Sequence, residues 1–162
     1  MVLMPNKMHR YSLVFTLILV VFGLDQITKF LVQRFLELGE SWPSEGIFRL
    51  TSSFNTGSAF GLFTGQNTPL ILVSFLGIGF LSWIYSTQKH PRRLLTGSLA
   101  LQLGGALGNL CDRLRIGYVV DFIDVGPWPI FNVADSAIVV GLITLGWLFL
   151  TNRISNVVPV DD

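Results

Sequence analysis

PLILVSFLGIGFLSWIYS, the stretch from Pro69 to Ser86, contains no charged residue. A helix needs about 20 mostly apolar residues to cross the hydrocarbon core of a bilayer, and about 17 to 25 are tolerated. Three further apolar runs of similar length lie elsewhere in the chain. The sequence therefore predicts an all-α polytopic membrane protein with four transmembrane helices, at about 11–30, 69–86, 94–110 and 132–151.

The composition supports a membrane protein. Of the 162 residues, 51% are hydrophobic and only 13% are charged, whereas globular domains carry about 25% charged residues. The formal net charge of +1 gives no basic field that would attract nucleic acid. The single cysteine, Cys111, excludes an intramolecular disulfide and a multi-cysteine metal site. After the four spans, no room remains for a second domain, so residues 1–162 are expected to form one membrane-embedded domain.

The distribution of basic residues predicts the orientation. Cytoplasmic segments of membrane proteins carry an excess of Lys and Arg. The two ends of the chain and the link between the second and third spans hold six basic residues and no acidic residue before the terminal Asp161-Asp162. These basic residues are Lys7, Arg10, Lys89, Arg92, Arg93 and Arg153. Both termini are therefore expected to be cytoplasmic, with two outer loops at 31–68 and 111–131.

The first outer loop is too long for a connector without structure. Residues 47–51 and 58–63 have strand-like composition, and Asn55-Thr56-Gly57 between them is a turn signal. A small β-rich unit on the membrane surface is expected here. In the third span, Gly104, Gly105 and Gly108 have a spacing that allows close helix packing within the bundle.

The aspartates gather at one depth. Asp25, Asp112, Asp121, Asp124 and Asp135 all fall near the outer end of a predicted span or in the second outer loop. A proton-coupled transporter or channel would place ionisable groups near the bilayer midplane, where the predicted spans have none. A shallow acidic layer instead favours chemistry on a substrate that arrives at the outer surface, although an assembly protein that tolerates loss of these acids is a further alternative.

Other catalytic groups are scarce on that side. Both histidines, His9 and His90, fall on the cytoplasmic side, which excludes an outer Ser-His-Asp triad or histidine-rich zinc site. Two adjacent carboxylates remain, because one can keep a proton and the other can act as a base. Asp135 is the firmest candidate, since it lies inside a predicted span. From the residues alone, its partner is either Asp121 or Asp124.

Five sequence blocks resemble those of lipoprotein signal peptidase, also called signal peptidase II. They are DQITK at 25–29, NTGSAFG at 55–61, GNLCDRL at 108–114, VVDFID at 119–124 and FNVADS at 131–136. The blocks occur in the family's order and cover most of the chain.

The resemblance implies an aspartyl endopeptidase of the bacterial cytoplasmic (inner) membrane that needs no metal or other cofactor. It would cleave diacylglyceryl-modified prolipoproteins on the N-terminal side of the lipidated cysteine, near the outer face, and would bind globomycin-type cyclic peptide inhibitors. The catalytic pair falls on Asp121 and Asp135. Further matched positions, expected to bind substrate or support the pair, are Asp25, Asn55, Gly57, Asn109, Asp112, Arg113, Asn132 and Ala134. Membrane lipids are the other expected partners, and the chain is expected to be a monomer.

Several supporting residues also have a purely structural interpretation. Asn109 and Asn132 could cap helix ends, and Asn55 could be a turn residue. Asp112 could pair with Arg113 to brace the loop. Asp25 could pair with Lys29 or Arg113 and never contact substrate.

Overall fold

Four long helices and a small sheet make up the computed structural model, which describes residues 7–57, 65–88 and 91–151. The helices are α1 (Lys7–Phe35), α2 (Asn67–Thr87), α3 (Arg93–Ile116) and α4 (Val133–Leu150). The strands are β1 (Ser41–Trp42), β2 (Arg49–Asn55) and β3 (Val119–Asp124). All four helices are long and apolar enough to cross a membrane. The predicted fold class, a four-span helical protein with a small β-rich unit, is confirmed.

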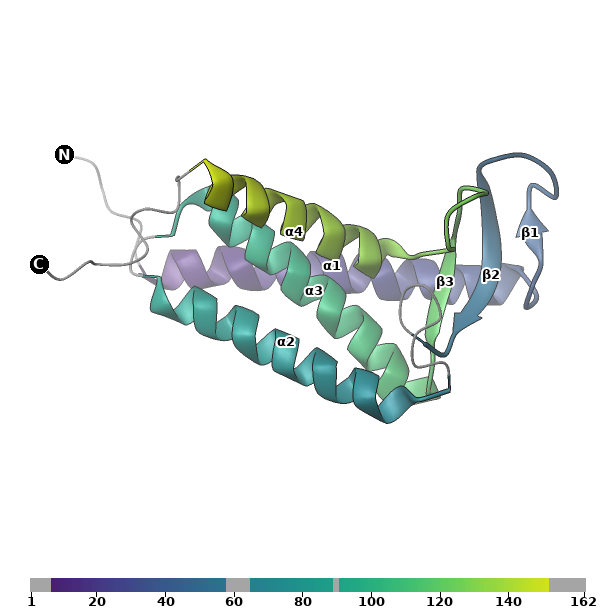
Figure 1. The fold of residues 1–162 in the computed structure, drawn as a ribbon, viewed down its shortest axis with the longest axis horizontal. Coiled ribbons are helices and arrows are strands. Elements are labelled where there is room, and N and C mark those ends of the chain that lie inside the picture. Colours follow the sequence, from purple (N-terminus) through teal and green to yellow (C-terminus); the bar gives the residue numbers. More distant parts are fainter. Residues whose placement is uncertain (1–6, 58–64, 89–90, 152–162) are drawn as a thin grey trace, which may run out of the picture.

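Helix α3 is the centre of the bundle. Within the described residues it packs against α1, α2 and α4, whereas α2 packs against α3 alone. Apolar side chains such as Leu99 and Leu148 are buried between the helices, and others such as Leu76 and Leu150 are exposed on the outer surface. Large exposed apolar side chains on a long helix are what a lipid-facing surface requires. The first turn of α1 and the last turn of α4 lie at the end of the bundle opposite the sheet (Figure 1).

Three glycines let the neighbouring helices approach α3 closely, as the spacing predicted. A Cβ on Gly104 would lie 2.7 Å from the Cβ of Val21 on α1. A Cβ on Gly105 would meet the carbonyl oxygen of Ala134 on α4. These contacts leave no space for a side chain, so α1 and α4 both pack directly on the backbone of α3.

The sheet lies at one end of the bundle and has the antiparallel order β1-β2-β3 (Figure 1). Strand β2 begins at Arg49 rather than at residue 47 and continues to Asn55, further than the predicted end at residue 51. The other expected strand, at residues 58–63, lies outside the described residues. Strand β3 falls in a segment for which the sequence predicted only an outer loop. It is buried at five of its six positions, so it has no alternation of polar and apolar residues that would reveal a strand.

Helix α3 also differs from its prediction. It continues six residues beyond the expected end at Leu110 and stops at Ile116, where Gly117 adopts a left-handed conformation with a φ of 85°. The prediction ended the apolar run before the charged Asp112. In the structure Asp112 is fully buried and paired with Lys29 on α1, so its charge does not require the helix to end. Helix α1 is likewise longer than the predicted 11–30.

Candidate active site

Strand β3 and the start of helix α4 bring Asp121 and Asp135 together. After β3 the chain turns and returns, and Phe131 pairs with Ile123 of the strand through two backbone hydrogen bonds of 2.7 and 3.1 Å. The next residue, Asn132, is therefore held beside β3 and is fully buried. Helix α4 begins immediately after it, which places Asp135 in the first turn, facing the strand that carries Asp121.

Asn132 contacts both acids. Its Oδ1 accepts a hydrogen bond of 2.8 Å from the backbone N–H of Asp135, and Asp135 Oδ2 accepts one of 3.3 Å from the backbone N–H of Asn132. This reciprocal pattern is a capping box, which stabilises the first turn of a helix. The side-chain Nδ2 of Asn132 donates to Asp121 Oδ1 at 2.6 Å. Asn132 is thus a helix cap, as one interpretation predicted, and also a direct partner of the acid pair.

Each acid has one further amide partner. Asn55 on β2 donates through Nδ2 to Asp121 Oδ2 at 2.8 Å, and its own Oδ1 accepts from the backbone N–H of Gly57 at 3.0 Å. Asn55 therefore combines the turn role with a contact to the acid. Asn109 on α3 donates through Nδ2 to Asp135 Oδ1 at 2.8 Å. It lies within the helix, so it does not cap a helix end.

The surroundings of Asp121 favour its protonated form. Burial and the adjacent negative charge of Asp135 raise the pKa of Asp121 to about 7, against the smaller opposing effects of its bonds to Asn55 and Asn132. Two carboxyl groups that lie close together do not both ionise easily near neutral pH. The pair can therefore hold one proton at a pH where an isolated aspartate would have lost it.

Both acids face a cavity of about 980 Å³. Its charged and amide lining residues are Asn55, Asn109, Arg113, Asp121 and Asp135. The remaining wall is mostly apolar, with residues such as Phe54, Trp128, Phe131, Ile138 and Val139. A site of this kind suits an apolar substrate with one reactive polar group.

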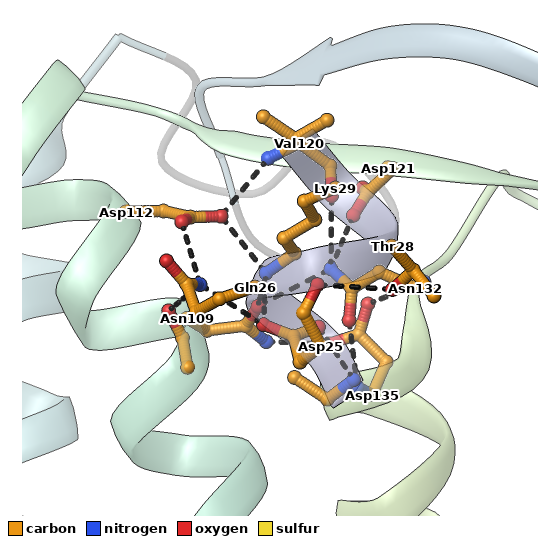
Figure 2. Close-up of polar contacts among 12 residues, drawn as sticks. Asp25, Gln26, Thr28, Lys29, Asn109, Asp112, Val120, Asp121, Asn132 and Asp135 are labelled. Atoms are coloured by element: carbon orange, nitrogen blue, oxygen red, sulfur yellow. Dashed lines mark hydrogen bonds and ion pairs between the residues drawn. The ribbon is translucent and has the colours of Figure 1, made fainter. Parts of the chain in front are cut away.

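Beside the acid pair, the buried Asp25, Lys29 and Asp112 form an ionic cluster together with the half-buried Gln26 (Figure 2). Lys29 Nζ forms ion pairs of 2.8 Å with both Asp25 and Asp112. Gln26 Nε2 donates to Asp112 at 3.0 Å and to Asp25 at 3.2 Å. Asp25 therefore pairs with Lys29, as one interpretation predicted. Asp112 also forms its ion pair with Lys29, whereas the structural interpretation had paired it with Arg113.

The remaining expected residues are placed as follows. The backbone N–H of Ala134 donates to Asp25 Oδ1 at 2.9 Å, which connects the start of α4 to α1. Arg113 lines the cavity and donates to the backbone oxygen of Asn109 at 3.5 Å. Asp124, the alternative partner for Asp135, points elsewhere and bonds to Arg49 at 2.6 Å and Thr51 at 2.9 Å. The structure therefore groups Asp121, and not Asp124, with Asp135.

Lys29 and Gln26 are the two residues of this region that the expected set did not contain. The available signal was the spacing of Asp25 and Lys29, four residues apart on one helix, which places the two side chains on the same face.

Within the described part of the chain, no group of three or more His, Cys, Asp or Glu side chains is arranged to hold a metal ion.

Comparisons with known proteins find a matching family. The profile of the family described as Signal peptidase (SPase) II matches residues 17–151. The lipoprotein signal peptidase of Moorella thermoacetica is 46% identical over 135 residues, which cover 83% of this chain and 90% of that protein. The corresponding protein of Desulforapulum autotrophicum is 41% identical over 157 residues, which cover 91% of this chain and 95% of that protein.

The fold is similar to that of solved membrane proteins. One structure, described as a bacterial membrane enzyme solved by the in meso method at 2.3 Å resolution, superposes with a TM-score of 0.83 at 28% identity and covers 93% of this chain and 94% of its own. A second, at 1.9 Å resolution, gives a TM-score of 0.78 at 29% identity, covering 86% and 93%.

Proposed function

This chain belongs to the signal peptidase II family of membrane peptidases, which remove signal peptides from prolipoproteins, and we propose that Asp121 and Asp135 are its aspartyl catalytic pair. The scissile bond is the one on the N-terminal side of a diacylglyceryl-modified cysteine. The observation that carries this proposal is the placement of two carboxyl groups on one shared partner, Asn132, at the polar end of a large apolar cavity.

The chemistry follows from one proton shared by two acids. The ionised carboxylate removes a proton from a water molecule as that water attacks the carbonyl carbon of the scissile peptide, and the protonated carboxyl donates to the carbonyl oxygen. When the tetrahedral intermediate collapses, the C–N bond breaks and the nitrogen receives a proton from the pair. Asn55 donates to Asp121 Oδ2 and Asn109 donates to Asp135 Oδ1, so each amide holds one of the two acids in place.

The cavity fits a lipidated substrate. Its wall is mostly apolar, so acyl chains and an apolar signal helix can occupy the wall while the peptide bond reaches the carboxyl groups. The site lies at the sheet end of the bundle, and the basic residues Lys7, Arg10, Arg92 and Arg93 belong to helix starts at the other end (Figure 1). Since cytoplasmic segments are enriched in basic residues, the acids lie near the outer face of the bacterial inner membrane and both termini are cytoplasmic.

The test is cleavage of a purified diacylglyceryl-modified prolipoprotein in detergent micelles, with the products identified by mass spectrometry. Asp121→Asn and Asp135→Asn are each expected to lower kcat by at least about a hundredfold, the usual contribution of a general acid or base. Asp124→Asn is the matched control, because Asp124 lies on the same strand but bonds to Arg49 and Thr51. It is expected to keep most of the activity.

Two further observations complete this test. The lipidated product should begin at the modified cysteine, and EDTA should leave the rate unchanged. Near-full activity in either Asp121→Asn or Asp135→Asn, with helical content like that of wild type, would contradict the aspartyl pair. Loss of turnover in EDTA would contradict the metal-free chemistry.

A further inference from the structure

We infer that Lys29 is a positioning residue for the catalytic pair, which it orients through the side-chain amide of Asn109. This inference rests on the proposed function of Asp121 and Asp135. Lys29 itself does not line the cavity and is only 2% exposed, so it has no access to a substrate bound there.

All three N–H bonds of the Lys29 ammonium group have acceptors. Nζ lies 2.8 Å from Asp25 Oδ2, 2.8 Å from Asp112 Oδ2 and 2.9 Å from Asn109 Oδ1. A lysine ammonium has three donors and no acceptor. Whichever group faces Nζ must therefore present an oxygen, and this requirement decides the orientation of the Asn109 amide (Figure 2).

With its oxygen turned to Lys29, the Asn109 amide has only one direction left for its nitrogen. Nδ2 points at Asp135 Oδ1, to which it donates at 2.8 Å. The same Asn109 oxygen also accepts from Asn132 Nδ2 at 3.2 Å, and that nitrogen bonds to Asp121. By fixing the Asn109 amide, Lys29 keeps Asn109 Nδ2 pointed at Asp135. It also keeps Asn109 Oδ1 beside Asn132, the residue that donates to Asp121.

Two carboxylates explain why the lysine stays in place. Asp25 and Asp112 are fully buried and come from different helices, α1 and α3. A stability role alone would need only these two ion pairs. The third bond, to Asn109, is the one that reaches the acids, so removing Lys29 should disturb catalysis in a way that general loosening of the cluster does not.

The electrostatic effect has a definite sign. The charged groups around the pair are Asp25 and Lys29 on α1, Asp112 and Arg113 on α3, Asp121 on β3 and Asp135 on α4. The positive charge of Lys29 lowers the pKa of Asp121. Without that charge the pair holds its one proton to higher pH, so the alkaline limb of the pH–rate profile, where that proton is lost, should move to higher pH.

The experiment compares Lys29→Met with Gln26→Leu in the prolipoprotein cleavage assay. Gln26 bonds to Asp25 and Asp112 but has no bond to Asn109, so its loss weakens the cluster without releasing the amide. Lys29→Met is expected to lower kcat between about tenfold and a hundredfold, the cost of misplacing catalytic groups by a fraction of an ångström to an ångström. Its KM should change little and its alkaline limb should move to higher pH.

Gln26→Leu should lower the thermal stability and leave both kcat and the alkaline limb near the wild-type values. A fall in kcat of the same size in both variants, or a wild-type kcat and pH profile in folded Lys29→Met, would overturn the inference. The proposed function is tested separately, because Asp121→Asn and Asp135→Asn would still abolish activity if only the role of Lys29 were wrong.

Lys29→Met leaves two buried carboxylates without their cation and can fail to fold for that reason. The double variant Lys29→Met/Asp112→Asn keeps the net charge of the cluster at its wild-type value, since it removes one positive and one negative group. Helical content measured by circular dichroism identifies the folded variants. A folded double variant with wild-type kcat would also overturn the inference, because it lacks the bond to Asn109.

Discussion

A methyl group added at Gly108 should disturb both the bundle and the catalytic pair. The new Cβ would lie 2.5 Å from Asp25 Oδ2 and 3.1 Å from Asp25 Cγ, roughly 1 Å closer than ordinary van der Waals contact. Asp25 has little freedom to move away, because it is fully buried and bonds to Lys29 at 2.8 Å and to the backbone of Ala134 at 2.9 Å. The clash must therefore shift α1 against α3 or displace the start of α4.

The expected cost of Gly108→Ala can be isolated with a control on the same helix. Forcing an extra methyl group into a packed interior costs about 1–3 kcal/mol, while replacing a helical glycine by alanine gains about 1 kcal/mol of helix propensity. Gly97, also on α3, has nothing within 4 Å of its added Cβ. Gly97→Ala gains the propensity without the clash, so the difference between the two variants is the packing cost of about 1–3 kcal/mol.

Thermal unfolding in detergent micelles, followed by circular dichroism, measures this difference. For a chain of this length about 1 kcal/mol corresponds to a Tm change of roughly 2–4 °C. Gly108→Ala should therefore unfold several degrees below Gly97→Ala. It should also cleave prolipoprotein more slowly, because the displaced Asp25 bonds to the backbone of Ala134, which directly precedes Asp135. A Tm for Gly108→Ala equal to or above that of Gly97→Ala would refute the close contact between α1 and α3 at this position.

Two predictions concern the protonation of Asp121. Its pKa is raised from 3.8 in the unfolded chain to about 7 in the folded protein, so its stabilising contribution is complete below about pH 4 and is lost as the pH rises through 7. The Tm of the wild type should therefore fall relative to that of Asp121→Asn between about pH 4 and 7, and parallel curves would contradict this. Asn55→Ala removes the 2.8 Å hydrogen bond that lowers the pKa of Asp121, so the alkaline limb of the pH–rate profile, where the pair loses its proton, should move to higher pH. Initial rates at saturating substrate measure that limb, and an unshifted limb in a folded variant would count against the bond.

The helices could be predicted because a lipid environment imposes a simple rule on the sequence. A segment that crosses the bilayer must be mostly apolar over a fixed length, and the four apolar runs satisfied that rule. The ends were less predictable, because a charged residue marks the end of an apolar run and not the end of a helix. Asp112 lies inside α3 because Lys29 on another helix neutralises it, which is information that residues near 112 do not contain.

The sheet shows a second limit of the same kind. Strand β3 is buried on both faces, so VVDFID has no alternation that would distinguish it from a loop or a short buried helix. The end of β2, by contrast, coincides with the turn signal that begins at Asn55. The turn is a local feature, since Asn55 accepts a hydrogen bond from Gly57 two residues later.

For the candidate site, the sequence could indicate the acids but not their supports. Asp135 stands out because a carboxylate inside an apolar span is costly. The choice between Asp121 and Asp124 depended on the family resemblance, since the residues alone allowed both. Lys29 was visible beside Asp25, but its bond to Asn109 joins residues 80 positions apart, and only the folded chain brings them together.

The spacing of Asp25 and Lys29 has a consequence for biosynthesis. Helix α1 is made and inserted before α3 exists, so Asp25 and Lys29 enter the membrane without Asp112. An isolated charged residue at the centre of a helix costs about 2.5–3.5 kcal/mol on insertion, but an Asp and a Lys one turn apart on the same helix can neutralise each other from the start. Helix α1 therefore brings its own counter-ion into the lipid, and Asp112 joins a pair that is already formed when α3 arrives during translation.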